Sequence, residues 1–398
     1  MGILVGAWVA RYLGPLQYGE LAYVVAFVAF FQVITLLGLD GIAIRDIARN
    51  KMESPVILGT VLRLRLILGF ICWGASVAGM SLFRPGDYQS LILTAIVAAS
   101  LIFQSANTID LWFQSQTQSK RSVIAKNSAY LITSSLKVWM ILAKASLVLF
   151  AAAGLIEMIL TAIALTAAYR IYPSPDRWKW DMTWAKQLTR ESWLYMLSGL
   201  AIIIYMRIDQ IMLREMMGER ELGIFSAALP ISTAWYFIPM MISQSVGPSI
   251  AKKKQTDPTG YDRAIDRLFS IMWWIMLPLS VAIALLSGSI VQLLYGDAYA
   301  TSATVLSVHV FANIPLGLGV MQSIWILNER KNTLSIYKTV AGAVTNIGMN
   351  LVLIPKYGAV GAAIATVISY MVAAFLSNIV FAPKIFRRQI VSLFGVSF

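Results

Sequence analysis

The sequence is poor in charged residues, since Asp, Glu, Lys and Arg make up 13% of its 398 residues. Soluble domains carry roughly 25% of these residues. Apolar residues make up 58% of the chain, which is more than a soluble protein of this length could bury. The composition excludes a soluble enzyme, a disordered chain and a secreted disulfide-bonded scaffold, and it indicates an all-α polytopic membrane protein.

Cysteine and histidine each occur once. A single cysteine, Cys72, forms neither an intramolecular disulfide nor a cysteine metal site, and a single histidine, His309, excludes paired-histidine chemistry. We therefore expect no metal and no cofactor, and we expect His309 to hydrogen-bond a neighbouring helix. The largest polar gaps, near 171–187 and 248–264, are too short for a folded soluble domain.

Long apolar runs account for most of the chain. A helix needs about 20 apolar residues to cross a bilayer. Eleven full spans are predicted near 19–39, 55–82, 90–113, 122–143, 146–169, 190–213, 222–247, 266–294, 302–327, 334–354 and 359–382. The apolar start, residues 1–13, is half a span. We expect this first helix to be truncated and the reading frame to extend upstream, because a half-helix would end in hydrocarbon.

An internal repeat favours twelve spans. Two glycines five residues apart, Gly14/Gly19 and Gly218/Gly223, occupy a short turn between apolar helices in each half of the chain. A second similarity between the halves is a tight turn with a lysine, at Lys144 and at Lys356, between the last two helices of each half. The chain is therefore predicted to form two pseudo-symmetric six-helix bundles.

The domain boundaries follow from this repeat. We expect an N-terminal bundle at 1–170, a cytoplasmic linker at 171–187, a C-terminal bundle at 188–383 and a cytoplasmic tail at 384–398.

Basic residues in the connections predict the orientation. Of the 32 Lys and Arg residues, 21 fall in loops on one side and five on the other, and the sides alternate along the chain. The positive-inside rule makes the first side cytoplasmic, together with the C-terminus. The net charge of +13 therefore mostly reports topology rather than a nucleic-acid partner.

A few charges are left inside the spans, where each is costly and needs a wet cavity or a partner. Lys137 and Arg207 lie deepest, and with Arg11 and Arg63 they are the candidate cationic substrate-binding residues. Snorkelling to a helix end is the simpler interpretation for Arg63, Arg65 and Lys338, and anchoring is equally plausible for Arg11.

The acidic residues within spans have two interpretations. Glu157, Asp209 and Asp110 are candidates for ion or proton coupling. Alternatively, Glu157 forms a structural ion pair with Lys137, and Asp110 pairs with Lys120 or Arg121.

An amphipathic segment, 41–53, is expected to lie on the cytoplasmic surface. Its Arg45, with Lys252 and Lys253 at the equivalent place in the second half, is a candidate for drawing in an anionic headgroup. Topology and general lipid attraction explain the same lysines.

Several motifs together resemble Wzx-type O-antigen and polysaccharide flippases of the multidrug/oligosaccharidyl-lipid/polysaccharide exporter superfamily, which has a MATE-like fold. They are ARYLGPLQYGELAY (10–23), LGLDGIAIRDIARN (37–50), NTIDLWFQSQ (107–116), RIDQIML with GIFSAA (207–228) and NLVLIPKYGAVGAAIATVIS (350–369). The family pattern falls on Arg11, Gly14, Gly19, Asp40, Arg45, Asp110, Arg207, Asp209 and Pro355. The short first helix and the Leu-Trp-Phe-Gln-Ser segment after Asp110 depart from it.

The resemblance implies two bundles around a cationic cavity that alternates between inward-open and outward-open states. The implied substrate is an undecaprenyl-diphosphate-linked oligosaccharide, moved from the inner to the outer leaflet of the bacterial inner membrane. Implied partners are membrane lipids, a polysaccharide polymerase and a chain-length regulator, with no nucleic acid. A cationic, hydrogen-bonding cavity suits a diphosphate and sugars that pass through apolar surroundings.

Two other functions are alternatives to the flippase. A cation-coupled drug antiporter of the same superfamily would place acidic groups deep in the bundle, which Glu157 and Asp209 could supply. A membrane glycan polymerase or glycosyltransferase needs an extramembrane catalytic surface, and every predicted outer loop is short. We therefore expect a transporter and not an enzyme. No nucleotide-binding pattern is present, so we expect no ATP-driven step within this chain.

Overall fold

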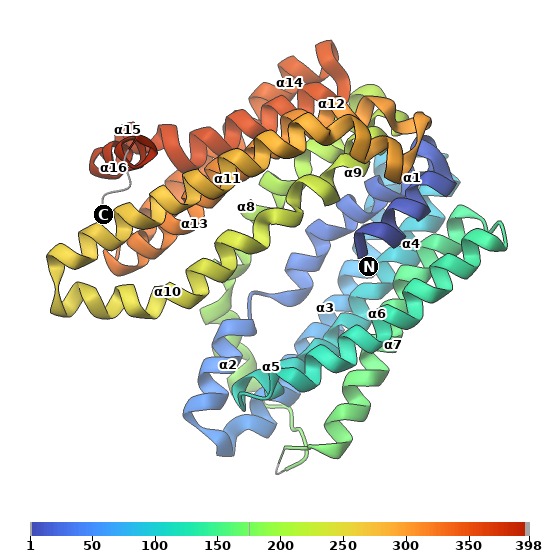
Figure 1. The fold of residues 1–398 in the computed structure, drawn as a ribbon. Helices are drawn as coiled ribbons and strands as arrows, with labels where there is room; N and C mark the ends of the chain where they lie inside the picture. The colour runs from blue at the N-terminus through green and yellow to red at the C-terminus, as the bar shows by residue number, and fades with distance from the viewer. Residues whose placement is uncertain (1, 175, 395–398) are drawn as a thin grey trace. The chain divides into compact units, whose positions relative to one another are not determined.

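The computed structural model describes residues 2–174 and 176–394, and every regular element in these ranges is helical (Figure 1). Nine helical stretches in them are long and apolar enough to cross a membrane. Two of these stretches, Gly2–Arg49 and Thr333–Phe381, contain an internal glycine with a non-helical backbone. The first therefore holds the initial half-span and one full span, and the second holds two full spans. The more polar helix at Ser119–Leu142 adds another. The eleven predicted full spans and the initial half-span are all present as helices.

The helices gather into two compact units. Unit 1 comprises Met1–Tyr12 and Glu20–Ile203, and unit 2 comprises Leu13–Gly19 and Ile204–Phe398. The first helix, α1 (Gly2–Leu36), contributes to both units, and so does α8 (Met182–Met217). The predicted division into bundles at 1–170 and 188–383, with a linker at 171–187, stays a prediction.

Unit 1 also contains the elements between α1 and α8. They are α2 (Asp40–Arg49), η1 (Lys51–Glu53), α3 (Ser54–Phe83), α4 (Tyr88–Phe103), η2 (Gln104–Asn107), α5 (Thr108–Ser115), α6 (Ser119–Leu142) and α7 (Leu147–Ile171). The helix α3 packs against α4, α6 against α7, and α4 against α7.

Unit 2 contains the elements after α8. They are α9 (Glu219–Thr233), η3 (Ala234–Tyr236), α10 (Phe237–Thr256), α11 (Pro258–Tyr295), η4 (Asp297–Tyr299), α12 (Ala300–His309), η5 (Val310–Ala312), α13 (Asn313–Asn328), α14 (Asn332–Met371), η6 (Val372–Leu376), α15 (Ser377–Phe381) and α16 (Pro383–Phe394). The helix α11 packs against α12, α13 and α16, while α14 packs against α12 and α13.

The repeat found in the sequence has a conformational counterpart. Gly14 adopts φ 72° and ψ 167°, and Gly218 adopts φ 92° and ψ near 179°. Both values lie in the region that glycine enters without the steric cost of a Cβ. Each glycine breaks the helix between two spans, so the same local device is used at the same place in both halves of the chain.

The amphipathic segment that begins at Asp40 packs more deeply than expected. Ile42, Ala43 and Ile47 of α2 are buried in a cluster with residues of α3 and α5. The charged side of α2 stays exposed at Arg45 and Arg49. A helix with one apolar face packs that face on its neighbours and leaves the other to water or headgroups.

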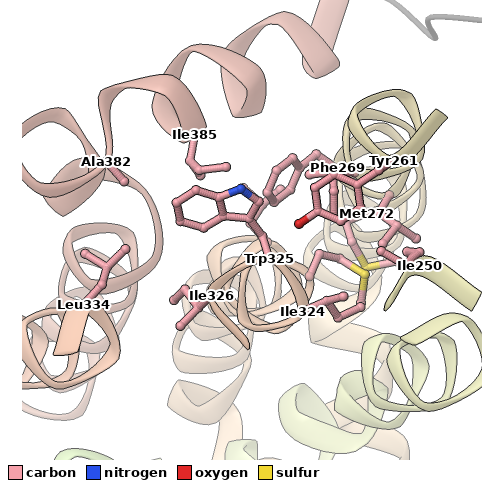
Figure 2. Close-up of a cluster of buried hydrophobic side chains, with 14 of the residues drawn as sticks. Ile250, Tyr261, Phe269, Met272, Ile324, Trp325, Ile326, Leu334, Ala382 and Ile385 are labelled. Carbon is pink, nitrogen blue, oxygen red and sulfur yellow. The ribbon is translucent and has the colours of Figure 1, made fainter. Parts of the chain in front are cut away.

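A second apolar cluster organises unit 2 (Figure 2). Trp325 and Ile324 of α13 lie among side chains of α10, α11 and α16, including Ile250, Phe269 and Ile385. This packing fixes the C-terminal end of α13, and with it the buried Gln322, which lies about one turn before Trp325.

Candidate functional site

The deepest predicted cation of the second half, Arg207, lies on α8 in unit 2 and is half-buried. Its Nη1 donates to Oε1 of Gln210 at 3.4 Å, and no ion pair of Arg207 is found in the described residues. The guanidinium is therefore held by a neutral amide, which leaves its positive charge available to an anion.

Asp209, two residues further on, faces elsewhere, as its spacing from Arg207 predicts. The carboxylate is 3% exposed, and it accepts from the hydroxyl of Thr366 at 3.2 Å and from the backbone N–H of Gln210 at 2.8 Å. It forms no ion pair within residues 2–174 and 176–394. Asp209 is thus a buried carboxylate whose hydrogen-bond partners are neutral, although the charge of Arg207 is near enough to act on it. A buried carboxylate without an ion pair is an expensive arrangement inside a membrane protein.

A chain of buried polar groups continues from Thr366. The hydroxyl of Ser369 donates to the Thr366 carbonyl, and Asn346 donates to Ser369 at 3.3 Å. Asn350 donates to Asn346 at 3.0 Å, and its own Oδ1 has no hydrogen-bond partner in the described structure. These asparagines were not among the predicted site residues, although their spacing of four residues in an apolar run places them on one helix face.

Lys137 and Glu157 form the ion pair that was one of the two alternatives. The Lys137 Nζ lies 3.0 Å from Glu157 Oε2, and both side chains are about four-fifths buried. Thr133 donates to the same carboxylate oxygen at 3.3 Å. The geometry explains how both charges are tolerated in unit 1, and the substrate role of Lys137 stays a prediction.

Asp110 is paired, but not with the predicted partner. Its carboxylate accepts from Lys126 at 2.5 Å, whereas Lys120 and Arg121 were expected. Arg121 instead lies over the ring of Tyr172. Lys120 and Arg121 lie in the first turn of α6, whereas Lys126 lies further along the same helix, where it contacts Asp110.

The two remaining predicted cations of the substrate set, Arg11 and Arg63, are exposed. Neither forms an ion pair in the described part of the chain, so snorkelling of Arg63 and anchoring of Arg11 at a helix end stay the simpler interpretations. Arg45 is different: it bonds Asp46 at 2.7 Å and Glu191 at 2.8 Å, and its charge is already balanced.

Lys252 and Lys253 are exposed at the end of α10. The next residue, Lys254, pairs with Glu329 at 3.0 Å. Asp257 lies after these lysines and accepts from the backbone N–H of Gly260 at 2.9 Å, which is the main reason that its pKa is lowered. A permanent negative charge therefore follows the lysine run and weakens its field.

Arg65 was expected to snorkel, and that expectation is wrong. Its side chain is fully buried, and it donates to the carboxylate of Asp40. Its Nε and Nη1 have no hydrogen-bond partner in the described structure. The arginine does not reach a headgroup because a carboxylate at the start of α2 lies within its reach.

Lys338 was expected to snorkel as well, and it is buried instead. It donates to Oε1 of Gln322, which also accepts from Asn378 at 3.2 Å. In both units a lysine contacts the residue sixteen positions before it, across the turn between two helices: Lys126 on Asp110, and Lys338 on Gln322. Unit 2 has an amide where unit 1 has a carboxylate, so the amino group of Lys338 has no acidic partner in the described residues.

The interpretation of His309 is confirmed. Its Nδ1 lies 2.8 Å from the hydroxyl of Ser232, which joins α12 to α9. The ring is buried and contacts Phe225 edge-on. It has a structural partner, and among the described residues no cluster of three or more metal-ligating side chains is found.

Comparison with known proteins gives the family. The profile of the family described as "Polysaccharide biosynthesis protein" matches residues 1–254, and that of "Lipid II flippase MurJ" matches residues 224–395. A curated relative, a probable flippase named AglR from Haloferax volcanii, is 30% identical over 194 residues, which is 47% of this chain. The chain spans 40% of the length of that relative.

Solved structures show the same fold. A multidrug resistance MATE family transporter of the MOP superfamily, in an inward-facing conformation, superposes with a TM-score of 0.75 at 18% identity, over 98% of this chain and 95% of the other. The lipid II flippase MurJ in an inward closed conformation gives a TM-score of 0.75 at 14% identity, over 99% and 88%.

A MOP superfamily transporter from Pyrococcus furiosus gives a TM-score of 0.60 at 18% identity, over 100% of this chain and 92% of the other. At such identities the likeness concerns the fold alone, whereas the first family profile covers more than half of the chain. The chain is therefore a multi-pass membrane protein with a MATE-like fold, and it belongs to the polysaccharide biosynthesis protein family.

Proposed function

We propose that this chain is a flippase that moves an undecaprenyl-diphosphate-linked oligosaccharide, such as an O-antigen repeat unit, from the inner to the outer leaflet by alternating access. The observation that carries the proposal is Arg207, a cation within a span that is bound only to an amide in a member of a polysaccharide biosynthesis family. A diphosphate is the anion that such a family handles, and a guanidinium binds phosphate oxygens in pairs.

The other proposed substrate-binding cations differ in whether another side chain already balances their charge. Arg11 and Arg63 are exposed, and Lys137 must leave or share Glu157 to reach an anion. Lys252 and Lys253 are the proposed approach for the headgroup, together with Arg45 once Glu191 releases it. Sugars and diphosphate would follow these groups while the polyprenyl tail remains in lipid.

For ion or proton coupling, Asp209 is the best supported of the three candidate carboxylates. Glu157 and Asp110 are already neutralised by Lys137 and Lys126, at 3.0 and 2.5 Å. Asp209 hydrogen-bonds only a hydroxyl and a backbone amide in the described residues, and Arg207 acts on it without an ion pair. A bound cation or proton would therefore add a positive charge in direct contact with the carboxylate.

The test compares Arg207→Ala and Arg207→Lys in a strain that lacks the gene. We expect Arg207→Ala to reduce surface polysaccharide and to accumulate lipid-linked intermediates, and Arg207→Lys to restore a part of the transport because it keeps the charge. The matched control is Arg220→Ala, which removes an exposed cation from the first turn of α9. Normal surface polysaccharide in a well-expressed Arg207→Ala strain would contradict the proposal.

The alternative, a cation-coupled drug antiporter, is favoured by one observation, the buried carboxylate of Asp209. A drug antiporter would raise the resistance of a pump-deficient strain to lipophilic cations, and Asp209→Asn would abolish that resistance. The flippase proposal expects no change in drug resistance in the same strain.

We further propose the cellular setting that this function requires. The protein would reside in the bacterial inner membrane with a cytoplasmic C-terminus, and it would act beside a polysaccharide polymerase and a chain-length regulator. The proposed bundles at 1–170 and 188–383 would move against each other during alternating access. The proposed cytoplasmic linker at 171–187 joins them, and the proposed cytoplasmic tail at 384–398 follows the second bundle.

A further inference from the structure

A groove of about 710 Å³ opens on the surface of unit 1, between α3 and the beginning of α8. Its apolar wall includes Leu64 and Ile67 of α3, and its other wall carries Lys186 and Arg190. Trp180 and Trp193 also line it. Nothing in the proposed transport mechanism uses this groove.

Backbone contacts build this groove. The N–H of Lys179 donates to the carbonyl of Pro55 at 3.1 Å, and the N–H of Asp181 donates to the hydroxyl of Thr60 at 3.2 Å. Gly59 permits the approach, because a Cβ there would lie 2.3 Å from the Lys179 carbonyl oxygen. The segment before α8 is thus bound along the first turns of α3.

The start of α8 is fixed in the same way. The Asp181 side chain accepts from the backbone N–H of Trp184 at 2.8 Å, which caps the first turn of the helix. The segment before α8 is thus bound to α3, and α8 begins at a fixed residue after it. These contacts define the distance between the two walls of the groove.

The charge of the groove is uncompensated. Lys186 and Arg190 are four residues apart, which puts them on one face of α8. Both are exposed, and neither has an ion pair among the described residues. The adjacent carboxylate, Glu191, is already bound to Arg45 at 2.8 Å and to Gln187 at 3.2 Å.

We propose that this groove binds one anionic phospholipid. Its phosphate would lie between Lys186 and Arg190, its acyl chains would cover Leu64 and Ile67, and the indoles of Trp180 and Trp193 would lie at headgroup depth. Two cations beside an apolar wall match a lipid phosphate above acyl chains, and tryptophan prefers that interface. A phospholipid is the occupant because the bilayer holds it in large excess over any other anionic lipid.

The experiment is native mass spectrometry of the full chain in detergent, with dioleoyl phosphatidylglycerol or dioleoyl phosphatidylcholine added. We expect the wild type to retain one phosphatidylglycerol and to bind phosphatidylcholine far more weakly. The double variant K186Q/R190Q should bind phosphatidylglycerol roughly 30-fold more weakly, since each cation near a membrane surface contributes about fivefold.

Two further variants control this result. R49Q/K51Q removes two exposed cations outside the groove and should bind phosphatidylglycerol like the wild type. Ile67→Trp fills the apolar wall without a change in charge and should also lose the lipid, which keeps the test decisive if K186Q/R190Q folds poorly. Size-exclusion elution and the melting temperature report folding.

Three results would overturn the proposal. They are equal phosphatidylglycerol affinity of the wild type and K186Q/R190Q, equal binding of phosphatidylcholine and phosphatidylglycerol by the wild type, and displacement of phosphatidylglycerol by an equimolar polyprenyl diphosphate. The last result would make the groove a substrate site. The transport assays of Arg207 variants are independent of all three.

Discussion

Buried basic residues are stabilised in three ways in this protein. Arg65 donates to a carboxylate, Lys137 shares Glu157 with a threonine, and Lys338 has only amides. A buried charge costs several kcal/mol of hydration, and a neutral hydrogen bond returns less of that cost than a carboxylate does. Of these three residues, Lys338 is therefore the one whose burial its contacts stabilise least.

Replacing Lys338 by Met should leave unfolding unchanged or make it harder. The methionine keeps the volume and removes a buried amino group that has no acidic partner in the described residues, and Gln322 still accepts from Asn378 at 3.2 Å. We expect a gain of about 1–3 kcal/mol, seen as a higher melting temperature in detergent. Lys338→Ala is the control for volume, since it opens a cavity. A lower melting temperature for Lys338→Met would show that the lysine stabilises unit 2.

The Lys137–Glu157 pair predicts a coupling energy. Removal of either partner leaves a largely buried charge, so Lys137→Met and Glu157→Gln should each lower the melting temperature, and the double variant should recover much of the loss. We expect a coupling of about 1–3 kcal/mol in a double-mutant cycle. Additive single effects would mean that the ion pair contributes nothing. Transport by the double variant then reports whether the charge of Lys137 has a second use.

At the scale of elements, the two glycine turns do more than break helices. An added Cβ at Gly19 would lie 1.8 Å from the Glu219 carbonyl oxygen, and one at Gly223 would lie 1.8 Å from the Pro15 carbonyl oxygen. Residues 13–19 and the start of α9 therefore cross with backbone against backbone, and each supplies one of the two glycines. The contact is reciprocal, as expected of a repeat that packs on itself.

Substitution at this crossing should be costly. Gly223→Ala forces the two backbones apart, and we expect a loss of about 1–3 kcal/mol or more, with a clear fall in melting temperature. Gly288→Ala is the matched control in α11, because no atom lies within 4 Å of its added Cβ. Alanine there should be neutral or stabilise by about 0.4–1 kcal/mol. Equal behaviour of the two variants would mean that the crossing is loose.

The elements were largely predictable from the sequence, and the contacts were not. Apolar runs near 20 residues fix where helices lie, and the glycines at 14 and 218 fix where two of them break. The partner of Asp110 depends on which face of α6 packs toward α5. That packing is a tertiary feature, so the sequence alone does not predict it. For the same reason Arg65 and Lys338 were assigned to headgroups although protein groups lay within their reach.

At the scale of the whole molecule, the basic residues predict which end of each helix faces the cytoplasm. The single cysteine, Cys72, is buried, so introduced cysteines can be labelled selectively. We expect Lys253→Cys to react with an impermeant maleimide only after the cells are permeabilised, and Tyr88→Cys to react in intact cells. The opposite pattern would reverse the orientation and the proposed direction of transport.

The candidate site was predictable in kind rather than in detail. The sequence predicted that Arg207, Lys137 and Asp209 lie within long apolar helices, and the structure places them on α8 and α6. Whether each is neutralised depends on tertiary contacts, and those contacts separate Arg207 and Asp209 from the paired Lys137.

The chain passes from unit 1 into unit 2 at Leu13, returns at Glu20, and crosses again only after Ile203. A cut in the linker near residue 180 would consequently yield two fragments of which neither holds one complete unit. The N-terminal fragment would carry seven residues that belong to the other unit, and the C-terminal fragment would lack them. The fragments should accumulate only when they are produced together, and an affinity tag on one should then recover the other.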